Sequence, residues 1–235
     1  MKQLATQIMN HNILIVVAHR DDEVLGCGAT IAKYIQAGSK VRCLFMGRGK
    51  ASRYSGGNNK KIKKEQGMLD QEAKKAAKIL GISEIIFEDF PDQQYDTVPF
   101  LKMVKVIEGV KNKFKPDIIF THHQGDLNLD HRTVFRAVMT ACRPLKNETV
   151  RKIYSCEVPS STEWSTAMPF VPNVFVDVKD FFNKKIEALK AYQSEIRDYP
   201  HPRSVRAVEI IARRWGLVVG KELVEAFELI REITT

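Results

Sequence analysis

Short apolar runs alternate with amphipathic stretches along the first 142 residues. Residues 13–17 (ILIVV) form a continuous apolar run, which is typical of a strand buried on both faces of a sheet. Further short apolar runs predict strands over 41–46, 85–87 and 117–121. Apolar positions at helical spacing predict helices over 26–36, 61–80, 98–114 and 132–142. Strands separated by helices indicate a parallel sheet with crossover connections.

The pattern favours a single α/β domain over residues 1–235. The chain contains no internal repeat and no linker-like stretch that would divide it. Residues 159–172 are irregular enough to form a lobe or lid on this domain.

The composition is that of an ordinary globular protein, with 44% hydrophobic and 28% charged residues. No apolar run approaches the roughly 18 residues that cross a bilayer, and the first twelve residues lack the apolar core of a signal peptide. We therefore expect a cytoplasmic protein without a membrane span. No Cys-x-x-Cys spacing occurs, so reduced buried thiols are expected at Cys27, Cys43, Cys142 and Cys156.

Polar residues follow the first predicted strand directly, as Ala-His-Arg-Asp-Asp-Glu over 18–23. In open parallel sheets, ligands bind beyond the carboxyl ends of the strands. His19 and Asp22 are three positions apart, so a tight turn directs both side chains to one point, and imidazole and carboxylate suit zinc. Asp21 lies between them and can act as a base. Alternatively, Asp21 or Asp22 caps the helix that follows.

A second polar cluster, residues 121–131, overlaps the end of the strand predicted over 117–121. Asp130 suits a helix cap, which places His131 in the first turn, where it can complete the metal site. Metal-binding histidines need groups that orient them, and the candidates here are Asp130, Asn128 and His122. Alternatively, two or three of these residues only cap turns.

These two clusters make the chain resemble the zinc-dependent de-N-acetylases of the LmbE-like or PIG-L type. Residues 18–23 look like the family motif A-H-P-D-D-E, and residues 121–131 look like T-H-H-x-G-D-x-N-x-D-H. Arg20 stands where the motif has proline, which leaves the rigidity of this loop open. Further similarity extends the resemblance over nearly the whole chain, at 90–92, 141–144, 160–164 and 199–204.

The resemblance implies a Rossmann-like three-layer α/β sandwich with a mostly parallel sheet. It also implies a Zn²⁺ ion held by His19, Asp22 and His131, with Asp21 as the general base. The reaction would be hydrolysis of an N-acetylglucosamine-type amino sugar to acetate and the free amine. Side chains that could line the sugar site are Arg143, Glu163 and His201, each with a structural role as the alternative.

The net charge of +9 is concentrated in residues 47–78, where ten Lys or Arg stand against three Asp or Glu. This segment is either a solvated surface or a site for an anionic partner. Its loop follows the predicted strand 41–46, so Arg53 and the nearby lysines are expected at the mouth of the metal site. The substrate would then be an anionic sugar derivative, such as a nucleotide-linked one.

Two other functions compete with this interpretation. A dinucleotide site is suggested by Gly26-Cys27-Gly28, but Ile31 stands where that motif needs its third glycine. A nucleotide- or nucleic-acid-binding protein could use the basic segment 48–64, which has Tyr54 as its one aromatic residue. We therefore expect a small-molecule substrate rather than nucleic acid. A homo-oligomer is possible, but the sequence does not indicate an oligomeric state.

Overall fold

The computed structural model describes residues 10–51, 54 and 59–234. Within them, one sheet has the strand order β3-β2-β1-β4-β5-β7-β6. The strands are β1 (Asn12–Val17), β2 (Lys40–Gly47), β3 (Glu84–Phe90), β4 (Ile118–His122), β5 (Lys152–Cys156), β6 (Val174–Asp177) and β7 (Val224–Glu232). Strands β1 to β5 pair in parallel, whereas β7 is antiparallel to both β5 and β6.

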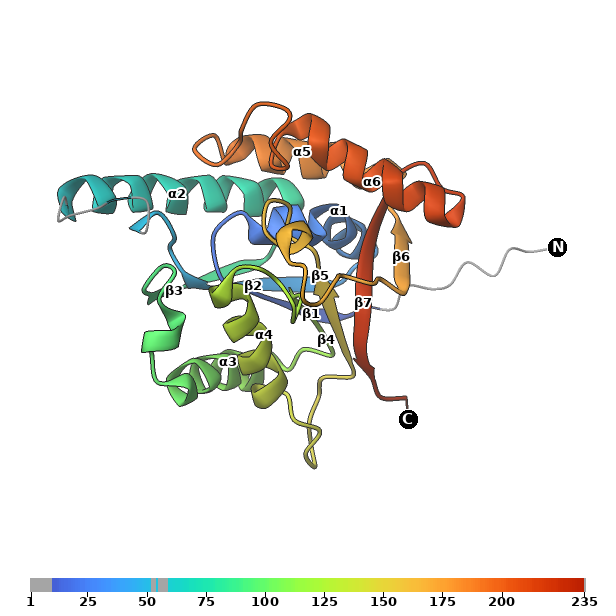
Figure 1. Ribbon diagram of the computed structural model, residues 1–235. Coiled ribbons are helices and arrows are strands. Elements are labelled where there is room, and N and C mark those ends of the chain that lie inside the picture. Colours follow the sequence, from blue (N-terminus) through green and yellow to red (C-terminus); the bar gives the residue numbers. More distant parts are fainter. Residues whose placement is uncertain (1–9, 52–53, 55–58, 235) are drawn as a thin grey trace.

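Helices cover both faces of the sheet and make three layers (Figure 1). One face is covered by α1 (Asp22–Gln36), α2 (Asn59–Leu80), α5 (Phe182–Ala191) and α6 (Val205–Val219), and the other by α3 (Phe100–Phe114) and α4 (Leu129–Ala141). The predicted Rossmann-like sandwich with a mostly parallel sheet is confirmed. No helix among the described residues combines the length and the apolar character that a membrane crossing requires.

The central strand β1 is buried on both sides, as its apolar run predicts. Ile13, Ile15 and Val17 pack into the core beneath α1 and α2, while Leu14 and Val16 pack into the core beneath α3 and α4. Alternate side chains of a strand point to opposite faces, so each face receives its own apolar set. All four cysteines are buried as free thiols.

The predicted elements of residues 12–142 are present, with shifted ends. The largest shift is in α1, which begins at Asp22 rather than Gly26. A kink at Cys27, where φ is −146°, separates its first turn from the rest. Residues 159–172 remain irregular apart from a short 3-10 helix over Thr162–Trp164.

Candidate metal site

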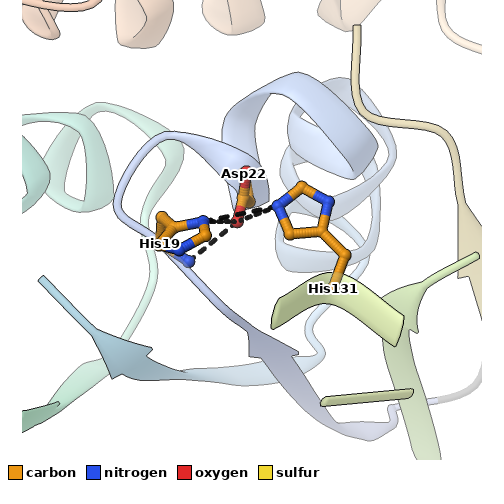
Figure 2. A group of neighbouring side chains, drawn as sticks. All are labelled: His19, Asp22 and His131. Atoms are coloured by element: carbon orange, nitrogen blue, oxygen red, sulfur yellow. Dashed lines mark hydrogen bonds and ion pairs between the residues drawn. The ribbon is translucent and has the colours of Figure 1, made fainter. Parts of the chain in front are cut away.

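Two adjacent parallel strands bring the predicted ligands together. β1 pairs with β4, so the carboxyl ends of the two strands meet at one edge of the sheet. His19 follows β1, Asp22 opens α1, and His131 lies in the first turn of α4, which follows β4. Figure 2 shows the three side chains pointing toward one another.

The separations of the three ligand atoms suit a tetrahedral metal ion. His19 Nδ1 lies 3.6 Å from Asp22 Oδ2, His131 Nε2 lies 3.5 Å from the same oxygen, and the two nitrogens are 3.3 Å apart. Tetrahedral bonds of the length found for zinc separate their ligands by about 3.3 Å. Asp22 Oδ1 is buried and has no hydrogen-bond partner in the described part of the chain. The donor set therefore fits a zinc ion.

The electrostatics of the cluster favour a positive charge at its centre. Burial by itself would raise the pKa of Asp22, but the neighbouring histidines His131, His19 and His122 hold it well below its usual range. Burial also opposes protonation of His19, yet hydrogen bonds with Asp130 and Asp22 raise its pKa to about 10. Such carboxylate-rich surroundings attract a proton or a metal cation.

The second ring nitrogen of each candidate histidine ligand faces a carboxylate. His19 Nε2 lies 3.0 Å from Asp130 Oδ2, and His131 Nδ1 lies 3.3 Å from Asp126 Oδ2. Asp92 also approaches His19 Nε2, at 3.4 Å. Carboxylates in this position fix the orientation of a metal-binding imidazole and increase its basicity. His19, Asp92 and Asp130 thus form a second cluster of possible metal ligands. It shares His19 with the cluster of His19, Asp22 and His131.

Asp126 is anchored by the irregular segment 159–172. Both its carboxylate oxygens accept hydroxyl hydrogen bonds, one from Ser161 and one from Thr162, the latter at 2.6 Å. Asp126 and Asp92 have no role that the sequence alone predicts, although both lie in stretches that carry the family resemblance. Their roles depend on contacts with distant residues, which no local pattern reveals.

Two other candidate residues, His122 at the end of β4 and Asn128 before α4, lie next to the cluster. His122 Nε2 accepts a hydrogen bond of 2.8 Å from the backbone N–H of Ala18, and its ring stacks on His131 with centroids 3.9 Å apart. Burial, reinforced by His131, lowers the pKa of His122 to about 3, so this ring is neutral. Asn128 caps α4, since its side-chain oxygen accepts from the backbone N–H of Asp130.

Asp21 stands beside the three ligand residues and outside their cluster. Its backbone has a φ of 98°, a left-handed conformation that costs energy for a residue with a Cβ. One carboxylate oxygen, Oδ2, accepts a 3.0 Å hydrogen bond from Arg203 Nη1. Burial raises the pKa of Asp21, and the positive charge of Arg203 opposes that rise. A buried carboxylate with a raised pKa is suited to proton transfer near neutral pH.

A polar pocket of about 120 Å³ gives access to Asp21 and His19. Its lining includes Asp92, Asn128, Lys50 and Arg203. Groups that donate and accept hydrogen bonds therefore surround the space beside the cluster, as binding of a sugar requires.

Three candidates for the sugar site do not line this pocket in the described residues. Arg143 follows the C-terminal end of α4, whereas Asp130 and His131 lie in its first turn, about 15 Å away along the helix, and Arg143 borders a different hollow. Glu163 accepts hydrogen bonds from the backbone N–H groups of Ser160 and Ser161. His201 Nδ1 accepts from the backbone N–H of Arg203. Arg53 lies outside the described residues.

Comparison with known proteins identifies the family. The model of the PIG-L family, described as GlcNAc-PI de-N-acetylase, matches residues 14–142. The Escherichia coli (strain K12) protein named uncharacterized deacetylase YaiS is 32% identical over 190 residues, covering 77% of this chain and 90% of that protein. The chain belongs to the PIG-L family. It is accordingly an N-deacetylase, a hydrolase of amide bonds.

Two more distant proteins are also similar to this chain, one in sequence and one in fold. The probable N-acetyl-alpha-D-glucosaminyl L-malate deacetylase 2 of Bacillus anthracis is 25% identical over 187 residues, covering 78% of this chain and 81% of that protein. The crystal structure of GalB, the 4-carboxy-2-hydroxymuconate hydratase of Pseudomonas putida KT2440, has a TM-score of 0.77 at 18% identity and covers 96% of this chain and 98% of that one. Because a hydratase has the same fold, the reaction assigned to this PIG-L chain rests on its family and its site.

Proposed function

We propose that this PIG-L deacetylase is a zinc-dependent hydrolase of N-acetylglucosamine-type amino sugars, and that it releases acetate and the free amine. The observation that carries the proposal is the buried carboxylate of Asp21 beside the cluster of His19, Asp22 and His131. Three protein ligands with a further position open to water are the pattern of catalytic zinc sites. The Bacillus anthracis relative, by its name, acts on an N-acetylglucosaminyl compound, which supports an amino-sugar substrate.

Several polar residues of the site would have a role in this reaction. When bound, zinc would supply Lewis-acid chemistry, because it polarises a carbonyl group and makes water more acidic. Asp21 would take the proton from the attacking water and pass it to the leaving amine. Asp130 and Asp126 would keep His19 and His131 in the orientation for binding the ion.

The proposal is tested by measuring acetate release from the zinc-loaded protein. We expect acetate from N-acetylglucosamine compounds and little from an N-acetyl amino acid, whose shape does not match a sugar pocket. The matched control is Asp21→Asn, which keeps the shape of the side chain and removes its ability to accept a proton. Acetate release that is equal in the wild type and in Asp21→Asn would refute the proposed mechanism.

The alternative function, binding of nucleic acid by the basic segment 48–64, has less support than the deacetylase function. Arg48 forms an ion pair of 2.7 Å with Asp89, and the buried ammonium group of Lys50 lies 2.8 Å from Glu195. These two cations neutralise carboxylates of the chain itself, so they contribute little to attraction of a polyanion.

A further inference from the structure

A short turn, residues 160–162, contacts both halves of the proposed catalytic site. It lies a few residues after β5, in the irregular segment of the chain. Side chains of the turn reach Asp126, the carboxylate that faces the ring of His131. Another side chain of the turn reaches Arg203, which donates a hydrogen bond to Asp21. The turn is therefore connected to a proposed metal ligand on one side and to the proposed base on the other.

On the metal side, the turn fixes the buried carboxylate of Asp126. The hydroxyl group of Thr162 donates a 2.6 Å hydrogen bond to Asp126 Oδ2, the oxygen that lies 3.3 Å from His131 Nδ1. The same hydroxyl oxygen accepts from the backbone N–H of Val158 at 2.8 Å, which leaves its single proton for Asp126. Ser161 donates to the other carboxylate oxygen, Oδ1. With both oxygens held, Asp126 cannot rotate away from His131.

On the base side, the turn fixes the guanidinium group of Arg203. Ser160 Oγ accepts a 2.7 Å hydrogen bond from Arg203 Nε, while Arg203 Nη1 donates to Asp21 Oδ2 at 3.0 Å. A guanidinium group is planar, so contacts through two of its nitrogens define its orientation. Ser160 thereby sets the direction from which Arg203 approaches Asp21.

The backbone of the turn has a conformation that depends on supporting contacts. Ser160 has a φ of 71°, in the left-handed region, which costs energy for a residue with a Cβ. The carboxylate of Glu163 stabilises this conformation, because it accepts from the backbone N–H of Ser160 at 2.7 Å and from that of Ser161 at 3.2 Å. Backbone strain of this kind is concentrated at functional sites, where the surrounding structure maintains it.

We propose that the turn of residues 160–162 is a positioning element for both halves of the site, which holds the proposed zinc ligand His131 and the proposed base Asp21 in the arrangement that hydrolysis needs. The inference rests on the proposed zinc-dependent deacetylase function, which assigns these two roles. Orientation of a metal-binding histidine governs metal affinity, whereas orientation of a base governs kcat. Substitutions in the turn should therefore affect the two halves separately.

The first experiment measures zinc affinity by competition with a chelator, in the absence of substrate. Ser161→Ala and Thr162→Val each remove one hydroxyl donor of Asp126 and should weaken zinc binding about tenfold, as loss of a group that supports a metal ligand does. Thr162→Ser keeps the hydroxyl group and should bind zinc as the wild type does. The matched control is Ser165→Ala/Thr166→Val, which removes the same two kinds of hydroxyl group from later positions of the segment, where Ser165 is partly buried and Thr166 is exposed.

Zinc affinity that is equal in the wild type, Ser161→Ala and Thr162→Val would overturn the positioning role, and so would an equal loss in the control variant. Thr162→Val also removes the acceptor for the backbone N–H of Val158. If this variant does not fold, Ser161→Ala alone decides the result, since the turn then keeps the hydroxyl group of Thr162.

The second experiment measures acetate release from N-acetylglucosamine by the zinc-loaded proteins. Ser160→Ala removes the acceptor for Arg203 Nε, so kcat should fall about fivefold, the effect of one lost hydrogen bond, while KM and zinc affinity stay unchanged. In a protein that already carries Arg203→Ala, the same substitution should cause no further loss, because its effect passes through Arg203. Losses that multiply in the double variant would overturn the link from Ser160 to Asp21.

The two experiments distinguish failure of this inference from failure of the deacetylase proposal. If zinc binding weakens in Ser161→Ala but the wild type releases no acetate, the deacetylase function and the role of Asp21 as a base are refuted, and the turn remains a support of the metal site. If the wild type releases acetate but substitutions in the turn change neither zinc affinity nor kcat, the positioning role is refuted and the deacetylase function stands.

Discussion

The guanidinium group of Arg203 lies 3.0 Å from the carboxylate of Asp21, a residue 182 positions earlier in the chain. The same group approaches Glu195 at 3.4 Å, and Glu195 pairs with Lys50 at 2.8 Å. These four side chains alternate in charge and all border the metal pocket. They join the loop after β1, the segment after β2 and the segment between α5 and α6. This ion-pair series holds the carboxylate of Asp21 in place beside the metal site.

Replacement of Arg203 should lower kcat while zinc content stays near that of the wild type. Arg203→Ala removes the hydrogen bond that fixes Asp21 but leaves the base itself, so we expect a loss of about 10- to 100-fold, smaller than the roughly 10²- to 10⁴-fold contribution of a general base. Arg203→Lys keeps the charge and should recover part of this loss. Steady-state kinetics together with metal analysis makes the measurement. A variant that loses zinc and activity in parallel would show that Arg203 supports the metal site instead.

Asp21→Asn should reduce kcat by roughly 10²- to 10⁴-fold, because the amide cannot accept the proton of the attacking water. Zinc content should not change, since Asp21 lies outside the cluster of His19, Asp22 and His131. Turnover and bound metal are measured on the same preparation. Activity within a few-fold of the wild type would exclude Asp21 as the base, and loss of zinc would make it a ligand or a support for one.

Arg20 links the metal-binding loop to α2. Its side chain is buried, with the guanidinium group 3.0 Å from Asp70 and 4.4 Å from the centre of the Phe87 ring. Its Nη1 also donates to the backbone carbonyl of Gly47. Arg20→Ala should therefore lower the free energy of unfolding by about 3 kcal/mol, because it leaves a cavity beside Phe87 and removes the contacts of the buried guanidinium group with Asp70 and Gly47. Denaturant unfolding measures the loss, and a change below about 0.5 kcal/mol, as at ordinary surface positions, would contradict it.

The proposed metal ligands and Asp21 were recognisable in the sequence because each lies in a short motif at the carboxyl end of a strand. Asp126 and Arg203 were not, because their roles come from contacts across the fold, such as that between Arg203 and Asp21. Arg143 also lies in a stretch that resembles the family, yet the structure places it beyond the end of α4 that is remote from His131.

The helices and strands that the sequence predicts are those with a clear pattern of apolar residues. β1 is a continuous apolar run, whereas β5 has the sequence KIYSC, in which polar and apolar residues mix over five positions. β7 joins the sheet antiparallel, and its pairing with β5 depends on residues about 75 positions apart. The helix predicted over 26–36 begins four residues earlier in the structure, and the polar residues Asp22 and Glu23 are both buried in the first turn of α1.

The pair of His123 and Glu228 should make stability depend on pH. Burial opposes the charge on His123, but its hydrogen bonds with Glu228 and the carbonyl of Met168 outweigh this and raise its pKa. A raised pKa means that the stabilisation is complete below the unfolded value of about 6.5 and is lost as pH rises through the folded value. The difference in Tm between wild type and Glu228→Gln should therefore be larger at pH 6 than at pH 9. A difference that is independent of pH would contradict a pKa of His123 that is raised by its pairing with Glu228.

The most direct test of the central claim is the zinc content of His131→Ala after dialysis. Only His19 and Asp22 would remain as ligands, so we expect most of the zinc to be lost, against about one ion per chain in the wild type. His201→Ala is the matched control, since His201 lies outside the cluster and should leave the zinc content unchanged. Near-stoichiometric zinc in His131→Ala would contradict the assignment of His19, Asp22 and His131 as the metal site.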